Sequence, residues 1–343
     1  MSSAPDFISL AQHLTQSAAP AAEDWADLMR GFCAPAIEDS AKSEALSILA
    51  ARRIDGEMLA ACAAFLLAEA TPLPLHDTQA IDVCGTGGDK SREGVKTFNI
   101  STASAFVAAA AGQSVIKHGN RAVSSQAGSS DVLAALGVAI AENAENATAD
   151  LDAFGLCFVA APAFHPVLKH AAAARRAHGQ PTFFNLLGPL CNPARVTRQI
   201  MGVFSAHYLT PVAEAAAALG KTDMLVLHSE DGLDEISLAA PTAARLLRGG
   251  RIESLTITPA DAGIQIQSLR DAAGGSAAEN AQIIETLFKA PQGAAADIVA
   301  LNAGAALWLA GRAADIAGGY ALALQTLQNG GAQDMLARMR RKA

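Results

Sequence analysis

The stretch Ile81-Asp-Val-Cys-Gly-Thr-Gly-Gly-Asp89 joins a short apolar segment to a loop with three glycines. We interpret Ile81–Cys84 as a β-strand, and the glycines allow the backbone after it to turn sharply and to approach a ligand closely. Farther on, Asn99-Ile-Ser-Thr102 has the polar residues that begin helices. The free N–H groups of a first helical turn bind anions and gain from the helix dipole. The stretch therefore predicts a strand, a phosphate-binding loop and a helix, although it is neither a Walker loop nor a dinucleotide fingerprint.

Outward from this unit, short apolar strands alternate with helical segments. We expect strands at Ser114–Lys117, Leu156–Ala160, Gln199–Phe204 and Asp223–His228, a hairpin at Arg248–Thr258, and helices at Ser101–Ala111, Ser130–Leu136, His165–His178, Pro211–Leu219, Glu279–Phe288 and Ala296–Ala310. This alternation predicts an α/β fold with a mostly parallel central sheet. Residues 1–75 are instead predicted to be helical, with apolar residues at helical spacing through Ala45–Ile54 and Met58–Leu67. The prolines in Thr71-Pro-Leu-Pro-Leu75 mark a boundary.

A second polar loop follows the strand that is predicted to end at Lys117. Lys117-His-Gly-Asn-Arg121 supplies two cations, and Ser124-Ser-Gln-Ala-Gly-Ser-Ser130 supplies hydroxyls and another helix start. Two such loops at the carboxyl ends of strands can form one crevice in an open α/β sheet, where these folds bind ligands. The alternative is that each loop is only a tight turn that caps a helix. The presence of both loops together with Lys117 and Arg121 favours an anion-binding site.

An acidic motif, Asp231-Gly-Leu-Asp-Glu235, follows the strand expected at Asp223–His228. On a regular strand Asp234 and Glu235 would face opposite ways, but in a turn that begins at Gly232 they can converge. Magnesium typically takes one or two carboxylates, and water and phosphate oxygens fill its other positions. The pair therefore suits a metal that bridges to a polyphosphate. The alternative is a solvated acidic turn in which Asp234 caps the next element.

The helix expected at His165–His178 is basic. Within it, Arg175 can bind a planar carboxylate through two parallel hydrogen bonds, although a surface charge is the usual fate of adjacent arginines. The apolar stretch Phe184–Leu190 either walls a pocket or belongs to the core. From the sequence alone, His165 and His228 are better explained as structural than as catalytic residues.

The overall charge and the cysteine content limit the possible partners and compartments. The net charge is −8 and the pI is about 5.5, so the protein's field repels nucleic acid and anionic membranes, and an anionic substrate needs local cations. No apolar run approaches the roughly 18 residues of a membrane span. Five cysteines without a C-x-x-C pair indicate a reducing compartment, and the first twenty residues do not resemble a signal peptide. We therefore expect a cytoplasmic protein that binds neither nucleic acid nor membrane.

Six motifs, taken in order, resemble those of the anthranilate phosphoribosyltransferase family. They are Gly85-Thr-Gly-Gly-Asp89, Thr97-Phe-Asn-Ile-Ser-Thr102, Lys117-His-Gly-Asn-Arg121, Gly128-Ser-Ser-Asp131, Asn185-Leu-Leu-Gly-Pro-Leu190 and Asp231-Gly-Leu-Asp-Glu235. The similarity extends to Gly274-Gly-Ser-Ala-Ala-Glu-Asn280 and Asp297-Ile-Val-Ala-Leu-Asn302 and is weakest over the first 40 residues. It implies a nucleoside phosphorylase/phosphoribosyltransferase-like fold, with a small all-helical domain plus a large α/β domain and the active site at the hinge. The small domain would comprise residues 1–75 with an inserted segment at about 170–195, and the large domain residues 76–169 and 196–343.

The same resemblance implies an activity and its residues. The enzyme would transfer the phosphoribosyl group of phosphoribosyl pyrophosphate to the amino group of anthranilate, in tryptophan biosynthesis, as a homodimer that uses Mg²⁺. The donor would be bound by Gly85, Gly88, Asp89, Thr97, Asn99, Ser101, Thr102, Lys117, Asn120, Arg121, Ser124, Ser125 and Ser129. Magnesium would be held by Ser101, Asp234 and Glu235. Anthranilate would be contacted by Gly85, Asn120, His165, Arg175 and Pro189. The residues expected to act in catalysis are Arg175, Asn120 and His118.

Two features depart from the family pattern. Seven residues, Lys90–Lys96, separate the Gly-Gly-Asp motif from the Thr-Phe-Asn motif where a shorter link is usual, and Ser229 replaces a glycine that is often found beside the acidic motif. The longer link adds three cations, and we expect Lys90, Arg92 or Lys96 to fold over the pyrophosphate.

Three alternative functions follow from the same residues. A pyrimidine-nucleoside phosphorylase of similar architecture would use inorganic phosphate without magnesium, and the Asp234–Glu235 pair argues against it. A phosphoribosyltransferase for another aromatic acceptor is compatible with the motifs, because pocket walls come from scattered residues. A non-enzymatic nucleic-acid-binding protein is disfavoured by the acidic charge and by the scarcity of interleaved basic and aromatic residues.

Overall fold

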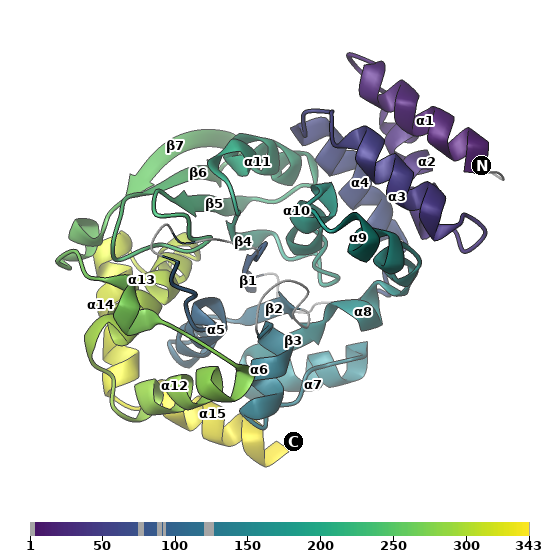
Figure 1. Cartoon of the computed structure of the whole chain (residues 1–343). Coiled ribbons are helices and arrows are strands. Elements are labelled where there is room, and N and C mark those ends of the chain that lie inside the picture. Colours follow the sequence, from purple (N-terminus) through teal and green to yellow (C-terminus); the bar gives the residue numbers. More distant parts are fainter. Residues whose placement is uncertain (1–3, 75–78, 88–90, 92–93, 120–126, 343) are drawn as a thin grey trace.

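The computed structural model describes residues 4–74, 79–87, 91, 94–119 and 127–342. Within these residues a seven-stranded sheet has the order β3-β2-β1-β4-β5-β6-β7 (Figure 1). Its parallel strands are β1 (Ile81–Gly85), β2 (Val115–Gly119), β3 (Leu156–Ala160), β4 (Arg198–Gly202) and β5 (Asp223–Ser229). The edge hairpin of β6 (Thr242–Arg248) and β7 (Arg251–Ile257) is antiparallel and turns at Gly249-Gly250. The predicted α/β fold with a mostly parallel sheet is therefore confirmed.

The strand order reverses beside β1. β2 and β3 continue the sheet on one side of β1, whereas β4 and β5 continue it on the other side. Gly85 pairs with Gly202, so the carboxyl ends of β1 and β4 lie next to each other. Open α/β sheets bind ligands in the crevice at such a reversal. The fold therefore directs attention to the loops that leave β1, β2, β4 and β5.

One face of the sheet is covered by helices that form a single core with Ile81, Val83 and Phe106. These helices are α5 (Ile100–Ala110), α6 (Ser129–Ala135), α12 (Ala277–Lys289), α13 (Gly293–Leu309), α14 (Ile316–Gln328) and α15 (Gly331–Lys342), and α7 (Ala144–Phe154) packs beside β3. Gly304 of α13 lies against Gly319 of α14, where a side chain on either residue would collide with the other backbone. Small residues thus allow close helix packing, as the high alanine content suggests.

The opposite face carries α11 (Leu209–Ala218) and, against it, the N-terminal helices. The N-terminal helices are α1 (Ala4–Gln16), α2 (Ala22–Cys33), α3 (Asp39–Leu49) and α4 (Gly56–Ala68). Phe32 of α2 contacts Phe7 and also Phe184 of α10 (Phe183–Leu190), with ring centroids 5.1 and 5.2 Å apart. The buried Lys42 donates from Nζ to the carbonyl oxygen of His170 at 2.7 Å. An internal segment of the chain therefore packs on the N-terminal helices (Figure 1).

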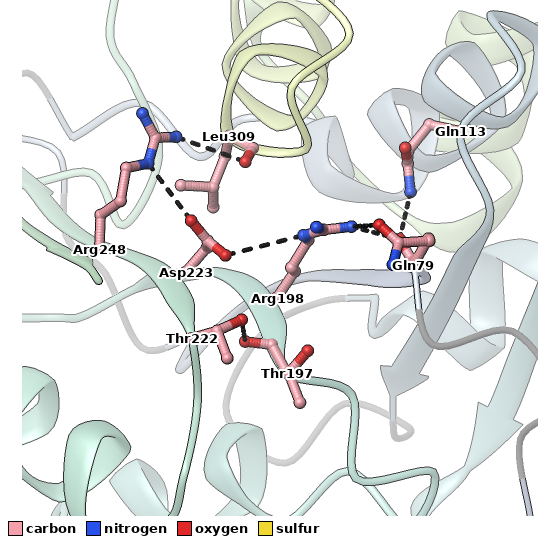
Figure 2. Close-up of polar contacts among 8 residues, drawn as sticks. All are labelled: Gln79, Gln113, Thr197, Arg198, Thr222, Asp223, Arg248 and Leu309. Carbon is pink, nitrogen blue, oxygen red and sulfur yellow. Dashed lines mark hydrogen bonds and ion pairs between the residues drawn. The ribbon is translucent and has the colours of Figure 1, made fainter. Parts of the chain in front are cut away.

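The amino ends of β4 and β5 are held by charged and amide side chains. Asp223 lies between Arg198 and Arg248, with N···O separations of 3.8 and 3.3 Å, and Arg198 also contacts Gln79 (Figure 2). Gln113 donates to the carbonyl oxygen of Gln79 at 2.7 Å. These partly exposed pairs cross-link neighbouring strands at the end of the sheet opposite the glycine-rich loops. Because the pairs satisfy one another, we assign them a structural role.

Two predicted helices have different boundaries in the structure. The helix expected at His165–His178 is divided into α8 (Ala161–Phe164), a 3₁₀ helix Pro166–Ala171 and α9 (Ala172–His178). Pro166 disfavours the α conformation in the residue before it, and His165 has φ −122° and ψ 61°. The helical pattern at Ala45–Ile54 is interrupted because α3 ends at Leu49 and Asp55 caps α4, accepting a hydrogen bond from the Met58 N–H.

The state of the cysteines and the character of the helices can be compared with the expectations from the sequence. All five cysteines lie in the described part of the chain and are free and buried. None of the helices among the described residues combines the length and the apolar character that crossing a bilayer requires.

Candidate active site

Three glycines at the carboxyl ends of strands allow close approach of other segments. A side chain at Gly85 would collide with the Asp234 carboxylate, and one at Gly119 would collide with the Ser129 hydroxyl. At Gly202 it would overlap the carbonyl group of Asp234. The acidic turn after β5 and the start of α6 are thus seated directly on the strand ends.

The acidic turn reaches both backbone segments of the first predicted phosphate loop. Gly232 has φ 100°, a left-handed conformation that turns the chain back after β5. Asp234 Oδ2 accepts a hydrogen bond from the Gly87 N–H at 2.8 Å, and Glu235 Oε1 accepts one from the Ser101 N–H at 3.0 Å. Burial raises the pKa of Asp234, and the Gly87 hydrogen bond partly opposes this shift. Two acidic side chains therefore accept hydrogen bonds from backbone N–H groups of the glycine-rich loop and of the start of α5.

Lys117 places a buried basic side chain beside the same helix start. Its side chain leaves β2, is 3% exposed, and donates from Nζ to Ser101 Oγ at 3.1 Å and to the Val83 carbonyl oxygen at 2.5 Å. Glu235 contacts the N–H of Ser101, so one helix start is shared by a cation and an anion. This arrangement can bind a polyphosphate together with a divalent metal.

The residues before α5 are held by contacts with the segment Ala273–Asn280, which lies far away in the sequence. Asn99 precedes the helix, and its Oδ1 accepts a hydrogen bond from Asn280 Nδ2 at 2.9 Å. Thr97 pairs with Ala273 as an isolated bridge, and Gly274 donates its N–H to the Lys96 carbonyl oxygen at 2.7 Å. The predicted donor residues Thr97 and Asn99 are therefore fixed by backbone and amide contacts.

Two buried histidines lie beside each other between β2 and the α8–α10 segment. The ring centroids of His118 and His165 are 5.4 Å apart, and His165 Nε2 donates to the Cys191 carbonyl oxygen at 2.6 Å. Burial lowers the pKa of His118 to about 3, with His165 adding to the shift, so the ring is neutral near pH 7. His118 Nε2 and His165 Nδ1 have no hydrogen-bond partner among the described residues.

Arg175 lies on α9 over an aromatic ring. Its guanidinium carbon is 5.0 Å from the centroid of the Phe184 ring, and burial lowers its pKa. No ion pair joins it to an acidic side chain in the described part of the chain. Pro189 lies in α10, and its carbonyl oxygen accepts a hydrogen bond from Gln199 Nε2 at 2.7 Å. This contact joins α10, the helix that follows α9 in the chain, to β4.

Comparisons with known proteins agree with this site. A family model described as "Glycosyl transferase family, a/b domain" matches residues 77–333. An anthranilate phosphoribosyltransferase from Saccharophagus degradans is 41% identical over 322 residues, which cover 92% of each chain. The chain belongs to the anthranilate phosphoribosyltransferase family.

Solved structures of anthranilate phosphoribosyltransferases have the same fold. The crystal structure from Thermus thermophilus is 37% identical and superposes with a TM-score of 0.88 over 98% of both chains. The Saccharomyces cerevisiae enzyme, solved in complex with phosphoribosyl pyrophosphate (PRPP) and Mg, is 23% identical, with a TM-score of 0.85 over 99% of both chains.

Several predicted donor residues cannot be placed in this member of the anthranilate phosphoribosyltransferase family. Gly88, Asp89, Asn120, Arg121, Ser124 and Ser125 lie outside the described residues, as do Lys90 and Arg92 of the longer link. Of the remaining donor residues, Thr102 is fully buried on α5, and its hydroxyl has no hydrogen-bond partner in the described part of the chain. Lys96 is exposed. The substrate contacts expected of the residues outside the described part, and of Thr102 and Lys96, therefore stay predictions.

Other residues shape the site and were not identified from the sequence. Asn192 Nδ2 donates to the buried Asp82 carboxylate at 2.9 Å, and the Asn302 amide contacts the acidic turn. Asn280 and Asn302 lie within segments that resemble the anthranilate phosphoribosyltransferase family, but the positions of these two residues in the sequence did not indicate what they contact. The sequence shows Gly202 only as a glycine in a strand. Its role is to make room for Asp234, which lies 32 positions farther along the chain, and this contact is visible only in the folded structure.

Proposed function

We propose that this protein transfers the phosphoribosyl group of PRPP to the amino group of anthranilate, giving N-(5-phosphoribosyl)anthranilate and pyrophosphate in tryptophan biosynthesis. The observation that carries the proposal is the convergence of Asp234 and Glu235 on the N–H groups of Gly87 and Ser101, beside Lys117. The relatives named anthranilate phosphoribosyltransferase support this choice of donor and acceptor.

The crevice suits a magnesium-bound pyrophosphate group. Asp234, Glu235 and the Ser101 hydroxyl supply hard oxygen donors, and they leave positions for water and donor oxygens, as Mg²⁺ prefers. The yeast relative is described as a complex with PRPP and Mg, which supports the same cofactor here. Bound Mg²⁺ would neutralise charge on the departing pyrophosphate. On donor binding, the pyrophosphate oxygens would take over N–H groups that the two carboxylates now occupy.

The protein's own residues would bind and orient both substrates. The bond from ribose C1′ to the pyrophosphate oxygen would break, a bond from C1′ to the anthranilate nitrogen would form, and the amine would release a proton that the departing pyrophosphate anion or solvent can take up. Lys117 and the first turn of α5 would bind the departing anion. Because an aromatic amine is already neutral at pH 7, attack requires no strong base beforehand. The pKa of His118 is about 3, so this residue is not a strong base, which is consistent with an attack that requires none.

Arg175 would orient anthranilate by binding the carboxylate of this acceptor. The Arg175 guanidinium is half-buried and has no acidic partner among the described residues, so it is available for such a contact. His118, His165 and Pro189 would line the acceptor's path, together with Asn120. The proposed small domain, residues 1–75 with about 170–195, would close on the large domain and exclude water that hydrolyses the donor.

A direct assay tests the proposed function. The protein is incubated with PRPP, Mg²⁺ and anthranilate, while the loss of anthranilate fluorescence and the release of pyrophosphate are followed. We expect both signals, and we expect a chelator to abolish them. Pyrophosphate release with another aromatic amine but not with anthranilate would reassign the acceptor. Metal-independent cleavage of a pyrimidine nucleoside by phosphate would replace the proposal with a phosphorylase.

We further propose that the protein is a cytoplasmic homodimer that pairs through its small helical domains. The free, buried cysteines agree with a reducing compartment. Light scattering coupled to size-exclusion chromatography should give twice the chain mass of 35.0 kDa. A single-chain mass at micromolar concentration would reject the dimer.

A further inference from the structure

The acidic turn is held by an asparagine from a distant helix. Asn302 lies on α13, 66 residues beyond Ile236, which directly follows Glu235. Asn302 Oδ1 accepts a hydrogen bond from the Ile236 N–H, and Nδ2 donates to the Ile236 carbonyl oxygen, both at 2.9 Å. Nδ2 also donates to the Ile298 carbonyl oxygen at 2.9 Å, which fixes the side chain against its own helix.

The chemistry of this contact requires an amide of this length. Ile236 is fully buried, so its backbone groups need partners other than water. One side-chain amide supplies both a donor and an acceptor, whereas a carboxylate supplies only acceptors and an aliphatic side chain supplies neither. Asn302 thereby fixes the backbone position from which the Glu235 and Asp234 side chains extend.

The same helix also holds the other half of the site. Ser104 of α5 donates from Oγ to the Val299 carbonyl oxygen of α13 at 3.3 Å, and the two helices pack closely together (Figure 1). Ser101 lies one turn earlier on α5, and its N–H meets Glu235 at 3.0 Å. α13 therefore contacts the acidic turn and also α5, one turn beyond the helix start that faces the acidic turn.

We propose that Asn302 is a positioning residue that sets the distance between the Asp234–Glu235 pair and the first turn of α5, and so sets the affinity for magnesium-bound PRPP. The inference rests on the proposed function, because it assigns the donor to this crevice. The Asn302 amide contacts backbone groups of Ile236 and Ile298, so we expect it to touch neither the donor nor the metal.

The test measures donor binding without turnover. PRPP is titrated calorimetrically into wild type, Asn302→Ala and Asn302→Asp in buffer with Mg²⁺ and no acceptor. We expect the affinity of both variants to fall by about tenfold or more, as is typical when a residue that orients metal ligands is removed. Asn146→Ala, on the exposed surface of α7, is the matched control and should bind like wild type. The deficit should shrink when Mg²⁺ is raised, because the defect acts through the metal ligands.

Thermal unfolding of each variant separates positioning from simple stability. Variants with a lowered Tm but wild-type PRPP affinity would overturn the inference, as would a deficit that does not respond to Mg²⁺. If Asn302→Ala does not fold, Asn302→Asp decides, because it keeps the shape and the acceptor for the Ile236 N–H. Failure of the wild type to bind PRPP would reject both proposals. Binding without transfer to anthranilate would reject only the proposed function, and the ratio between variants would still decide the inference.

Discussion

At the scale of single residues, Arg175 and Arg176 are adjacent but lie in different surroundings. Arg175 stacks on Phe184 and is partly buried, whereas Arg176 is exposed. Removing a charge-assisted hydrogen bond costs about 1.5–3 kcal/mol, which corresponds to roughly ten- to 150-fold in binding. We therefore expect Arg175→Ala to raise the KM for anthranilate by this factor and to leave the KM for PRPP nearly unchanged. Steady-state kinetics with each substrate varied in turn measures both constants, with Arg176→Ala as the control. A larger effect on the donor KM would refute the assignment.

His118 gives a prediction about stability and pH. Its pKa is about 3 in the folded protein and 6.5 in a model peptide, because burial disfavours the charged ring. The folded state thus favours the neutral ring. Above pH 6.5 His118 is neutral in both the folded and the unfolded state, and the free energy of unfolding is not reduced by its protonation. As the pH falls from 6.5 toward 3, the unfolded state gains a proton on His118 first, and the free energy of unfolding decreases. At about pH 5 the loss amounts to about 2 kcal/mol. Urea unfolding at about pH 5 and about pH 7.5 should show a smaller pH dependence for His118→Gln than for wild type. His207→Gln, on an exposed histidine, should behave like wild type; an unchanged pH dependence in His118→Gln would exclude His118 as the cause.

At the scale of elements, Gly202 ends β4 where the acidic turn crosses it. A methyl group there would overlap the Asp234 carbonyl group, which is backbone and cannot move away alone. Overpacking of this kind costs about 1–3 kcal/mol. We expect Gly202→Ala to lower the free energy of unfolding by about this amount and to raise the Mg²⁺ concentration needed for half-maximal activity. Gly318→Ala on α14, where the added carbon meets only the side chains of Asp315 and Ala313, should leave the Mg²⁺ dependence unchanged. Wild-type metal dependence in Gly202→Ala would show that the turn does not depend on this contact.

The elements that the sequence predicts well are those with local causes. The strand before the glycine loop, the helix ended by Gly220 and the hairpin at Gly249-Gly250 depend on periodicity and on glycines with positive φ. The division of the helix expected at His165–His178 also has a local cause, Pro166, but the prediction of one continuous helix was wrong. Contacts such as Asn280 to Asn99 and Asn302 to Ile236 join residues 181 and 66 positions apart. No spacing rule along one chain predicts such pairs, because they form only when helices dock on the sheet.

At the scale of the whole molecule, the two groups of proposed site residues lie on different parts of the structure. The described donor residues lie on β1, on β2, at or just before the start of α5 and at the start of α6, whereas Arg175 is on the segment that packs against the N-terminal helices. In the proposed division, the chain passes between these parts near Leu67, near His165–Ala171 and near Asn192–Arg195. There, Arg195 donates from Nη2 to the Leu67 carbonyl oxygen at 2.9 Å and has φ 50°, which is unusual for a residue with a side chain. The first and third of these proposed crossings are thus joined to each other, as a common hinge would require.

This arrangement predicts that both substrates are needed for full closure. Mg²⁺ and PRPP are proposed to bind at the carboxyl ends of the strands, so alone they should contract the molecule little, and an acceptor carboxylate should then draw the segment with Arg175 inward. Small-angle X-ray scattering can measure the radius of gyration without ligand, with Mg²⁺ and PRPP, and with benzoate added, because benzoate has the carboxylate but no amine to react. We expect the radius to decrease chiefly at the last step, and the Arg175→Ala variant to lack that decrease while it still binds PRPP. An equal radius in all three states would show that the two parts do not move, and water would then have to be excluded by the substrates themselves.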